Sequence, residues 1–249
     1  MKSIDINCDL GEGAGHDAAL MPLITSANIA CGQHAGNAAT MAATVALAKR
    51  HGVAIGAHPG FADRENFGRR EICITPRAAA ALVLEQIGAL QAVAVNAGLC
   101  LSHVKLHGAL YNMAARDREL AGAVTDAVKA AGERLRFFVL AGSELERVAR
   151  AQSDLRVVPE IFADRTYQRD GSLTPRSRPD ALIADETAMV AQLVRMIKTG
   201  CVRATDGTEV PIAAETVCLH GDGAHAVALA HRLRRELAAE GIRIQAPMA

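Results

Sequence analysis

Aromatic side chains are scarce in this sequence of 249 residues: they make up 3% of it, and tryptophan is absent. Without an aromatic cluster, no patch stands out as the hot spot of a protein interface. An excess of charge of one sign is also lacking, since 27 basic residues balance 27 acidic ones. A balanced chain lacks the electrostatic footprint of a protein that binds nucleic acid or an anionic membrane, so we expect neither partner.

Long apolar runs and paired cysteines are missing as well. We find no apolar run that approaches the length of a membrane span, and the first residues, MKSIDINCDL, have the pattern of a strand, not of a secretion signal. The six cysteines are scattered, without CxxC or zinc-type spacing. We therefore expect a cytoplasmic protein with reduced thiols.

Short strand-like runs alternate with alanine-rich helical stretches along the whole sequence. Strands are predicted over 3–9, 27–30, 53–57, 101–107, 136–140, 156–160 and 216–219. Helices are predicted over 38–51, 76–97, 117–131, 143–151, 186–198 and 224–240, and 161–185 has loop composition. This alternation predicts a parallel sheet with right-handed crossovers, which suits one α/β barrel or two small domains.

Polar motifs, most of which contain glycine, follow the end of each predicted strand. In chain order they are DLGEG, CGQHAGN, HPGFADRENFGRR, HGALYN, AGSE, EIFADR and HGDGAH. Barrels and open α/β sheets build their sites at the carboxyl ends of parallel strands. Seven such motifs in series predict a common rim around one pocket.

Two predicted strands carry polar residues at every second position, in DINCD (5–9) and in HVKLH (103–107). Alternate residues of a strand share a face, so each strand has one polar face. A parallel sheet covered on both sides should be apolar throughout. The two strands therefore predict a polar, partly hydrated barrel interior. A buried hydrogen-bonded network without a chemical role is the alternative.

Histidines near the rim raise the question of a metal ion. On a regular strand, which rises about 3.3 Å per residue, the Cα atoms of His103 and His107 lie about 13 Å apart, too far to share one ion. We expect His103 to lie deep in the barrel and His107 at its mouth. A metal would need ligands from several strands, for which the candidates are Asp9, His34 and His58, with Glu12 as a further one. Histidines that are only hydrogen-bonded are the alternative.

Anion binding has no standard motif here. The glycines of DLGEGAGHD have His16 where a dinucleotide fingerprint needs its third glycine, and a P-loop is absent. Arg69 can hold phosphate or a carboxylate, or belong to a solvated loop. Arg165 can do the same, or brace the long loop that follows it. In the last motif a capping role explains Asp222, but not His220 at the strand end.

The blocks DINCDLGEG, ITSANIACGQHAGN, GAHPGF, FGRR, HVKLHGALYN, FADRTY and HGD together resemble the LamB/YcsF family, in order from residue 4 to beyond 225. The resemblance implies one domain over 1–249, a distorted TIM-like (β/α) barrel with about seven parallel strands, similar to polysaccharide deacetylases. It also implies the activity of prokaryotic 5-oxoprolinase. That enzyme opens the lactam 5-oxoproline to L-glutamate with hydrolysis of ATP, presumed here to carry Mg²⁺, and it needs separate B and C subunits.

Lactam opening of this kind requires a base that activates water, cations for phosphoryl oxygens and donors for a tetrahedral intermediate. Under the resemblance, Asp9 or Glu12 is the base, and His58, Lys105 and His107 stabilise negative charge. Residues predicted to bind substrate are Asn7, His34, Arg69, Glu160, Arg165, His220 and Asp222, with Arg69 or Arg165 on the substrate carboxylate.

The sequence departs from the expected family pattern at Asn37, where aspartate is expected. Asparagine caps a helix as well as aspartate does, so we predict that Asn37 caps the helix that follows. Two other functions stay open. One is a metal-dependent deacetylase or amidase of the same barrel type that works without ATP. The other is a non-catalytic subunit that binds substrate for its partners. Assembly into a homo-oligomer is open too.

Overall fold

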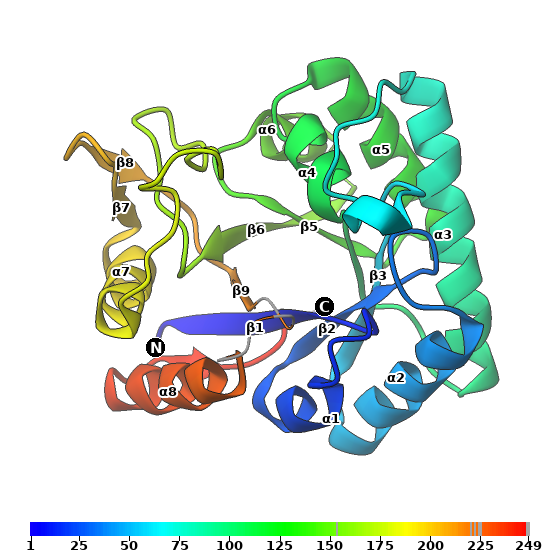
Figure 1. Cartoon of the computed structure of the whole chain (residues 1–249), viewed down its shortest axis with the longest axis horizontal. Helices are drawn as coiled ribbons and strands as arrows, with labels where there is room; N and C mark the ends of the chain where they lie inside the picture. The colour runs from blue at the N-terminus through cyan, green and yellow to red at the C-terminus, as the bar shows by residue number, and fades with distance from the viewer. Residues whose placement is uncertain (153, 220, 222, 224–225, 248–249) are drawn as a thin grey trace.

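The computed structural model of the chain describes residues 1–152, 154–219, 221, 223 and 226–247. Within them, seven parallel strands pair in chain order, and the last pairs with the first to close a barrel (Figure 1). These strands are β1 (Ser3–Leu10), β2 (Ser26–Ala30), β3 (Ala54–His58), β4 (His103–Lys105), β5 (Arg136–Leu140), β6 (Arg156–Phe162) and β9 (Thr216–Leu219). The predicted α/β barrel of about seven parallel strands is confirmed.

Helices surround the barrel and connect its strands (Figure 1). The longer ones are α2 (Ala38–His51), α3 (Pro76–Asn96), α5 (Arg118–Ala131), α6 (Glu144–Ala151), α7 (Glu186–Thr199) and α8 (Ala226–Ala239). All six were predicted, although residues 224 and 225 of the last prediction lie outside the described part. The side chain of Asn37 accepts a hydrogen bond from the Thr40 amide, so its predicted role as the cap of α2 is confirmed.

Several short elements were not predicted. They are α1 (Asp17–Leu20), α4 (Gly108–Ala114), two 3₁₀ turns, η1 (Met21–Leu23) and η2 (Arg64–Asn66), an antiparallel pair of β7 (Cys201–Arg203) and β8 (Glu209–Pro211), and β10 (Arg243–Ile244). The last of these pairs in parallel with the start of β1. The predicted loop begins later than expected, because β6 continues to Phe162.

Helix α3 corrects the statement that no apolar run approaches membrane-spanning length. Its 21 residues include a window of mean hydropathy 1.7, and among the described helices it alone is long and apolar enough to cross a membrane by length and composition. In this structure α3 packs on the barrel, with Val83, Ile87 and Leu90 buried. Leu84 and Val95 on the same helix are exposed.

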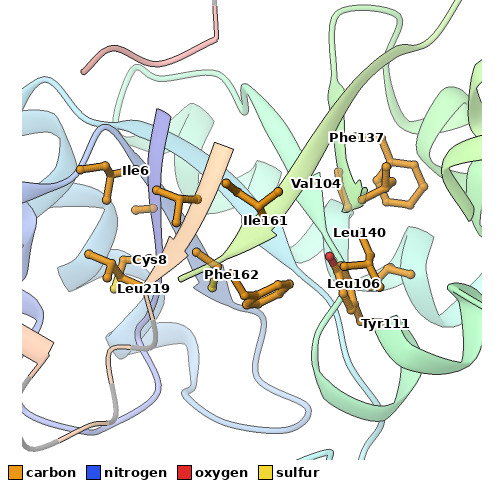
Figure 2. Packing of buried hydrophobic residues seen from close by; sticks show 14 of the residues in the cluster. Ile6, Cys8, Val104, Leu106, Tyr111, Phe137, Leu140, Ile161, Phe162 and Leu219 are labelled. Atoms are coloured by element: carbon orange, nitrogen blue, oxygen red, sulfur yellow. The ribbon is translucent and has the colours of Figure 1, made fainter. Parts of the chain in front are cut away.

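The two faces of the barrel wall differ in polarity, as the alternation in β1 predicts. Ile4, Ile6, Cys8 and Leu10 belong to the buried apolar cluster, in which apolar side chains of β1, β6 and β9 gather (Figure 2). Their neighbours in β1, the polar residues of DINCD, are also buried, and they form hydrogen bonds with polar side chains of β2 and β9. The predicted polar interior is therefore confirmed.

The bottom of the interior is filled by the ring of His103, as predicted for this residue. The ring stacks on Phe138 with centroids 4.2 Å apart, and its Nε2 lies 2.8 Å from Asn28 Oδ1. On its other side stands Gly56, where an added Cβ would lie 2.2 Å from a ring carbon. Only a glycine at this position of β3 leaves room for the imidazole.

Candidate active site at the barrel mouth

A cavity of about 130 Å³ opens at the carboxyl ends of the barrel strands. Its volume has room for on the order of ten water-sized groups, which suits a small molecule. Predicted site residues that line it are Asp9, Glu12, His58, Arg69, Lys105, His107 and Arg165. Asn7, His34 and Glu160 are also buried but are not among its lining residues. The predictions for His220 and Asp222 lie outside the described residues, whereas Gly221 between them lines the cavity.

Lys105 is the centre of the polar interior. Four acceptors surround its ammonium group: Nζ lies 2.9 Å from Asp9 Oδ1, 2.9 Å from Glu160 Oε1, 3.1 Å from Asn7 Oδ1 and 2.9 Å from Cys218 Sγ. An ammonium has three protons, so these acceptors compete for it. The lysine is thus fixed between two carboxylates while its side chain still forms part of the cavity wall.

Burial by itself would lower the pKa of Lys105, but the surrounding negative charge, Asp9 foremost, outweighs burial and holds the pKa well above its ordinary value. Lys105 is therefore a permanent cation and not a general base at neutral pH. Asp9 accepts a further bond at the same Oδ1, from Asn28 Nδ2 at 2.8 Å. Its other oxygen, Oδ2, lies 3.4 Å from His58 Nε2.

Glu160 and Asn7 support the lysine from below. Asn7 Nδ2 donates to Glu160 Oε1 at 2.9 Å and to Thr216 Oγ1 at 2.7 Å. The phenol of Tyr111 donates to the other oxygen of Glu160 at 2.6 Å. Burial, together with the charge of Glu160, raises the pKa of Tyr111 well above its usual range, so the phenol keeps its proton.

Three histidines and Glu12 meet beside this lysine. Glu12 Oε1 lies 3.1 Å from His34 Nε2 and 3.4 Å from His107 Nδ1, and His107 Nδ1 lies 3.0 Å from His58 Nε2. The rings of His34 and His107 stack with centroids 3.7 Å apart. Each residue follows or ends a different strand, from β1 to β4. The predicted convergence of the rim motifs is confirmed for these four.

Burial and neighbouring charges decide which imidazoles are neutral. Desolvation, with the nearby His58, lowers the pKa of His107 to about 3. Desolvation, with both other histidines, also lowers the pKa of His34 well below its ordinary value. Burial opposes the charged form of His58 too, but Asp9 overcomes it, so the pKa of His58 is raised. At neutral pH, His34 and His107 therefore offer unprotonated nitrogens.

Arginines enclose the outer side of the cavity. Arg69 stacks over the ring of Phe67, with its guanidinium carbon 4.9 Å from the centroid. Arg165 donates to the carbonyls of Thr174 and Ala181, so it braces the long loop, one of its two predicted roles, while it also lines the cavity. Both arginines, with Arg176, also line an adjoining cavity of about 730 Å³.

Some residues at the site were not predicted. Tyr111 stands in the HGALYN motif, but its place on the short helix α4 brings it back over Glu160. Cys218 was predicted only to be a reduced thiol, although its position in TVCL puts it next to the lysine. Asn28, at the alternate position after Ser26 in β2, carries the same signal of polar alternation as DINCD and could have been found by it.

Comparison with known proteins agrees with this architecture. A protein from Bacillus licheniformis, named as the A subunit of 5-oxoprolinase, is 51% identical, and the match covers 99% of both chains. The protein of the same name from Geobacillus kaustophilus is 53% identical, over 99% of this chain and 98% of its own. The crystal structure of a lactam utilization protein from Thermus thermophilus superposes with a TM-score of 0.91 at 46% identity, over 98% of this chain and all of the other.

More distant structures share the fold. The polysaccharide deacetylase Bc1974 from Bacillus cereus superposes with a TM-score of 0.52 at 13% identity, covering all of this chain and 93% of its own. The predicted similarity in shape to deacetylases is therefore confirmed at the level of the fold. A profile of the LamB/YcsF family matches residues 4–249. The closed barrel, the rim motifs and this match over nearly the whole sequence establish that the chain belongs to the LamB/YcsF family.

Proposed function

We propose that this chain is the A-type subunit of a 5-oxoprolinase, which opens 5-oxoproline to L-glutamate with hydrolysis of ATP and works with B and C subunits. The observation that carries the proposal is Lys105, a buried permanent cation that forms part of the wall of a cavity sized for a small molecule. Full-length relatives at about half identity that are named for this activity support it. In this proposal residues 1–249 act as one barrel domain.

The chemistry follows from the stability of an amide. A five-membered lactam is a poor electrophile. We therefore propose that its oxygen first accepts the γ-phosphoryl group of ATP, and that ADP is the leaving group. A first water then attacks the activated ring carbon, the ring C–N bond breaks and the nitrogen takes a proton, which gives γ-glutamyl phosphate. A second water hydrolyses this acyl phosphate to L-glutamate and phosphate. Mg²⁺ would accompany the nucleotide and neutralise its phosphates.

In this scheme Asp9 is the residue that activates water. Lys105 and Asn28 donate to its Oδ1, and its Oδ2 lies 3.4 Å from His58 Nε2, whereas Glu12 Oε1 lies near the three histidines. Lys105 lies beside it and stabilises the negative charge that develops on the lactam oxygen. His58 and His107, which line the same cavity, are proposed to assist at the rim.

The arginines supply the remaining charge. A substrate carboxylate is best held by the planar fork of Arg69 or Arg165. The larger cavity that they share with Arg176 has the volume of a nucleotide-sized site, and we propose that it receives the phosphates of ATP.

Three residues change role relative to the prediction from sequence. Asn7 and Glu160 lie beneath Lys105, and His34 lies behind Glu12, so we propose that they position the lining residues and do not touch the substrate.

The decisive experiment measures glutamate released from 5-oxoproline with ATP. It compares this chain alone, the B and C subunits alone, and all three mixed. Activity only in the mixture supports the shared enzyme. Activity of the B and C subunits without this chain would reject a catalytic role for it. The cluster of Glu12 and three histidines favours a metal-dependent amidase or deacetylase as the second candidate, so a folded but inactive mixture would be screened with amide and acetyl substrates.

A further inference from the structure

Four side chains at the barrel mouth direct their donor atoms at one point. Glu12, His34, His58 and His107 each offer one oxygen or nitrogen, and these atoms all lie within 4.8 Å of one another. The three histidines are buried, and the Glu12 side chain is only 5% exposed. Buried lone pairs that converge in this way are compensated by hydrogen bonds or by a bound cation.

Four of the six separations between the donor atoms are close to those of a four-coordinate ion, and all six are at most 4.8 Å. With bonds of about 2.0–2.1 Å to zinc, neighbouring ligand atoms of a tetrahedron stand about 3.4 Å apart. Here the separations are 3.0 Å between His58 Nε2 and His107 Nδ1, and 3.4 Å between that Nδ1 and Glu12 Oε1. Glu12 Oε1 lies 3.1 Å from His34 Nε2 and 3.8 Å from His58 Nε2.

The protons of two rings are fixed by backbone carbonyls, which only accept hydrogen bonds. His58 Nδ1 lies 2.8 Å from the carbonyl oxygen of Lys105, and His107 Nε2 lies 2.8 Å from that of Phe67. Both nitrogens must therefore carry hydrogen. The other two nitrogens, His58 Nε2 and His107 Nδ1, face each other at 3.0 Å, so a metal ion or one shared proton can lie between them. Ligand histidines of metal sites are oriented in this way by their second nitrogen.

The surroundings fix the rings in this arrangement. His34 and His107 stack on each other, and Gly60 and Gly68 press against them. An added Cβ at Gly68 would lie 2.9 Å from the Cβ of His34, so a side chain there would displace the ring. Because of this close packing, neither imidazole can rotate away from the other, and both ring nitrogens stay directed at the same place.

We propose that Glu12, His34, His58 and His107 bind one divalent transition-metal ion, with zinc as the metal that this donor set fits best. Three imidazoles and one carboxylate favour zinc and similar ions over Mg²⁺ or Ca²⁺, which take oxygen ligands. Four protein ligands complete a tetrahedron, so the ion ties together the loops after β1, β2 and β4 and the end of β3. This inference is independent of the proposed function, because it concerns the isolated chain without ATP or 5-oxoproline.

The first measurement is the metal content of the purified full-length chain by elemental mass spectrometry. A second step removes metal with a chelator and titrates Zn²⁺ back by calorimetry, with Co²⁺ as a spectroscopic probe of tetrahedral coordination. We expect one ion per chain, a cobalt spectrum typical of four ligands, and a higher melting temperature with zinc than without it.

Two variants test the site, so that the result does not depend on the folding of a single one. Glu12→Gln and His34→Ala should each weaken zinc affinity by at least about 100-fold, since they remove a direct ligand. His51→Ala, on the exposed end of α2, is the matched control and should bind like the parent chain. A folded parent chain that takes up neither Zn²⁺ nor Co²⁺ would overturn the proposal. So would undiminished binding in both variants.

Discussion

Lys105 and Glu160 form an ion pair inside the barrel, with Nζ 2.9 Å from Oε1 and both side chains almost fully buried. Asp9, which lies 96 residues before the lysine in sequence, holds the same ammonium from the other side. One positive charge is thus shared by two carboxylates that are both largely buried. This arrangement makes the lysine both a part of the proposed site and a condition of its stability.

Lys105→Met should therefore lose both activity and stability. The variant leaves two buried carboxylates without their cation, which we expect to cost about 3–5 kcal/mol in the free energy of unfolding. Glutamate release by the mixed subunits should fall by at least about 100-fold. Urea unfolding measures the first effect. Adding Glu160→Gln to Lys105→Met should recover about 1–3 kcal/mol, and strict additivity of the two changes would contradict the ion pair.

Gly56→Ala should destabilise the barrel although the change is small. The new Cβ would overlap the ring of His103, which Phe138 and Asn28 hold in place, so we expect a loss of about 2–3 kcal/mol in urea unfolding. Gly88→Ala is the matched control, because nothing lies within 4 Å of the added methyl group in helix α3. It should be neutral or stabilise by up to about 1 kcal/mol. Equal effects at both positions would refute the steric explanation.

Because of Asp5, the free energy of unfolding of the chain should decrease as the pH rises from 4 to 6. Burial raises the pKa of Asp5 from 3.8 to about 6, against the hydrogen bonds that Thr216, Thr25 and Ser26 donate to it. The folded chain then binds more protons than the unfolded one in this range, so the free energy of unfolding decreases as pH rises. The expected contribution is about 3 kcal/mol, present in full below pH 4 and lost above pH 6.

The Asp5 contribution can be isolated by difference. Urea unfolding of the parent chain and of Asp5→Asn is compared at several pH values from 4 to 7. The variant should gain stability relative to the parent as pH rises, because its amide does not ionise. A constant difference over the whole range would show that Asp5 does not titrate there.

Arg69→Ala should weaken substrate binding without unfolding the chain. Its guanidinium lines both cavities, and a charged hydrogen bond to a substrate anion contributes about 1.5–3 kcal/mol, which corresponds to an increase in KM of about 10–100-fold. The neighbouring Arg70, 66% exposed and 3.6 Å from Asp63, is the matched control. Steady-state kinetics with 5-oxoproline and with ATP varied separately would identify the ligand. Equal KM values for Arg69→Ala and Arg70→Ala would remove Arg69 from the site.

The alternation of polar and apolar residues was enough to predict which side chains enter the barrel. Because a strand has a period of two, residues 5, 7 and 9 had to share a face, as did 103 and 105. The rim was predictable for a similar reason, since parallel strands end at one edge. The alternation does not indicate which residue each side chain contacts across the barrel. Cys218 meets Lys105 from 113 residues away in sequence, and only closure of the ring determines that contact.

The missed elements share a physical cause as well. Strand four was predicted over 101–107, but β4 is hydrogen-bonded only over His103–Lys105, after which the chain leaves the sheet and enters α4. Such short pieces have too few residues to show a period, so tertiary contacts determine them. The strands of the β7–β8 hairpin have three residues each and β10 has two, so they could not be predicted for the same reason.

The pairing of β9 with β1 has a consequence for how the protein is made. Thr216 bonds to both Asp5 and Asn7, so the polar interior is incomplete until the strand that ends at Leu219 has left the ribosome. During most of synthesis, the carboxylates of β1 that are buried in the folded barrel lack their final partners. Contacts so distant in sequence slow folding, so we expect the barrel to close only after its last strand has been synthesised.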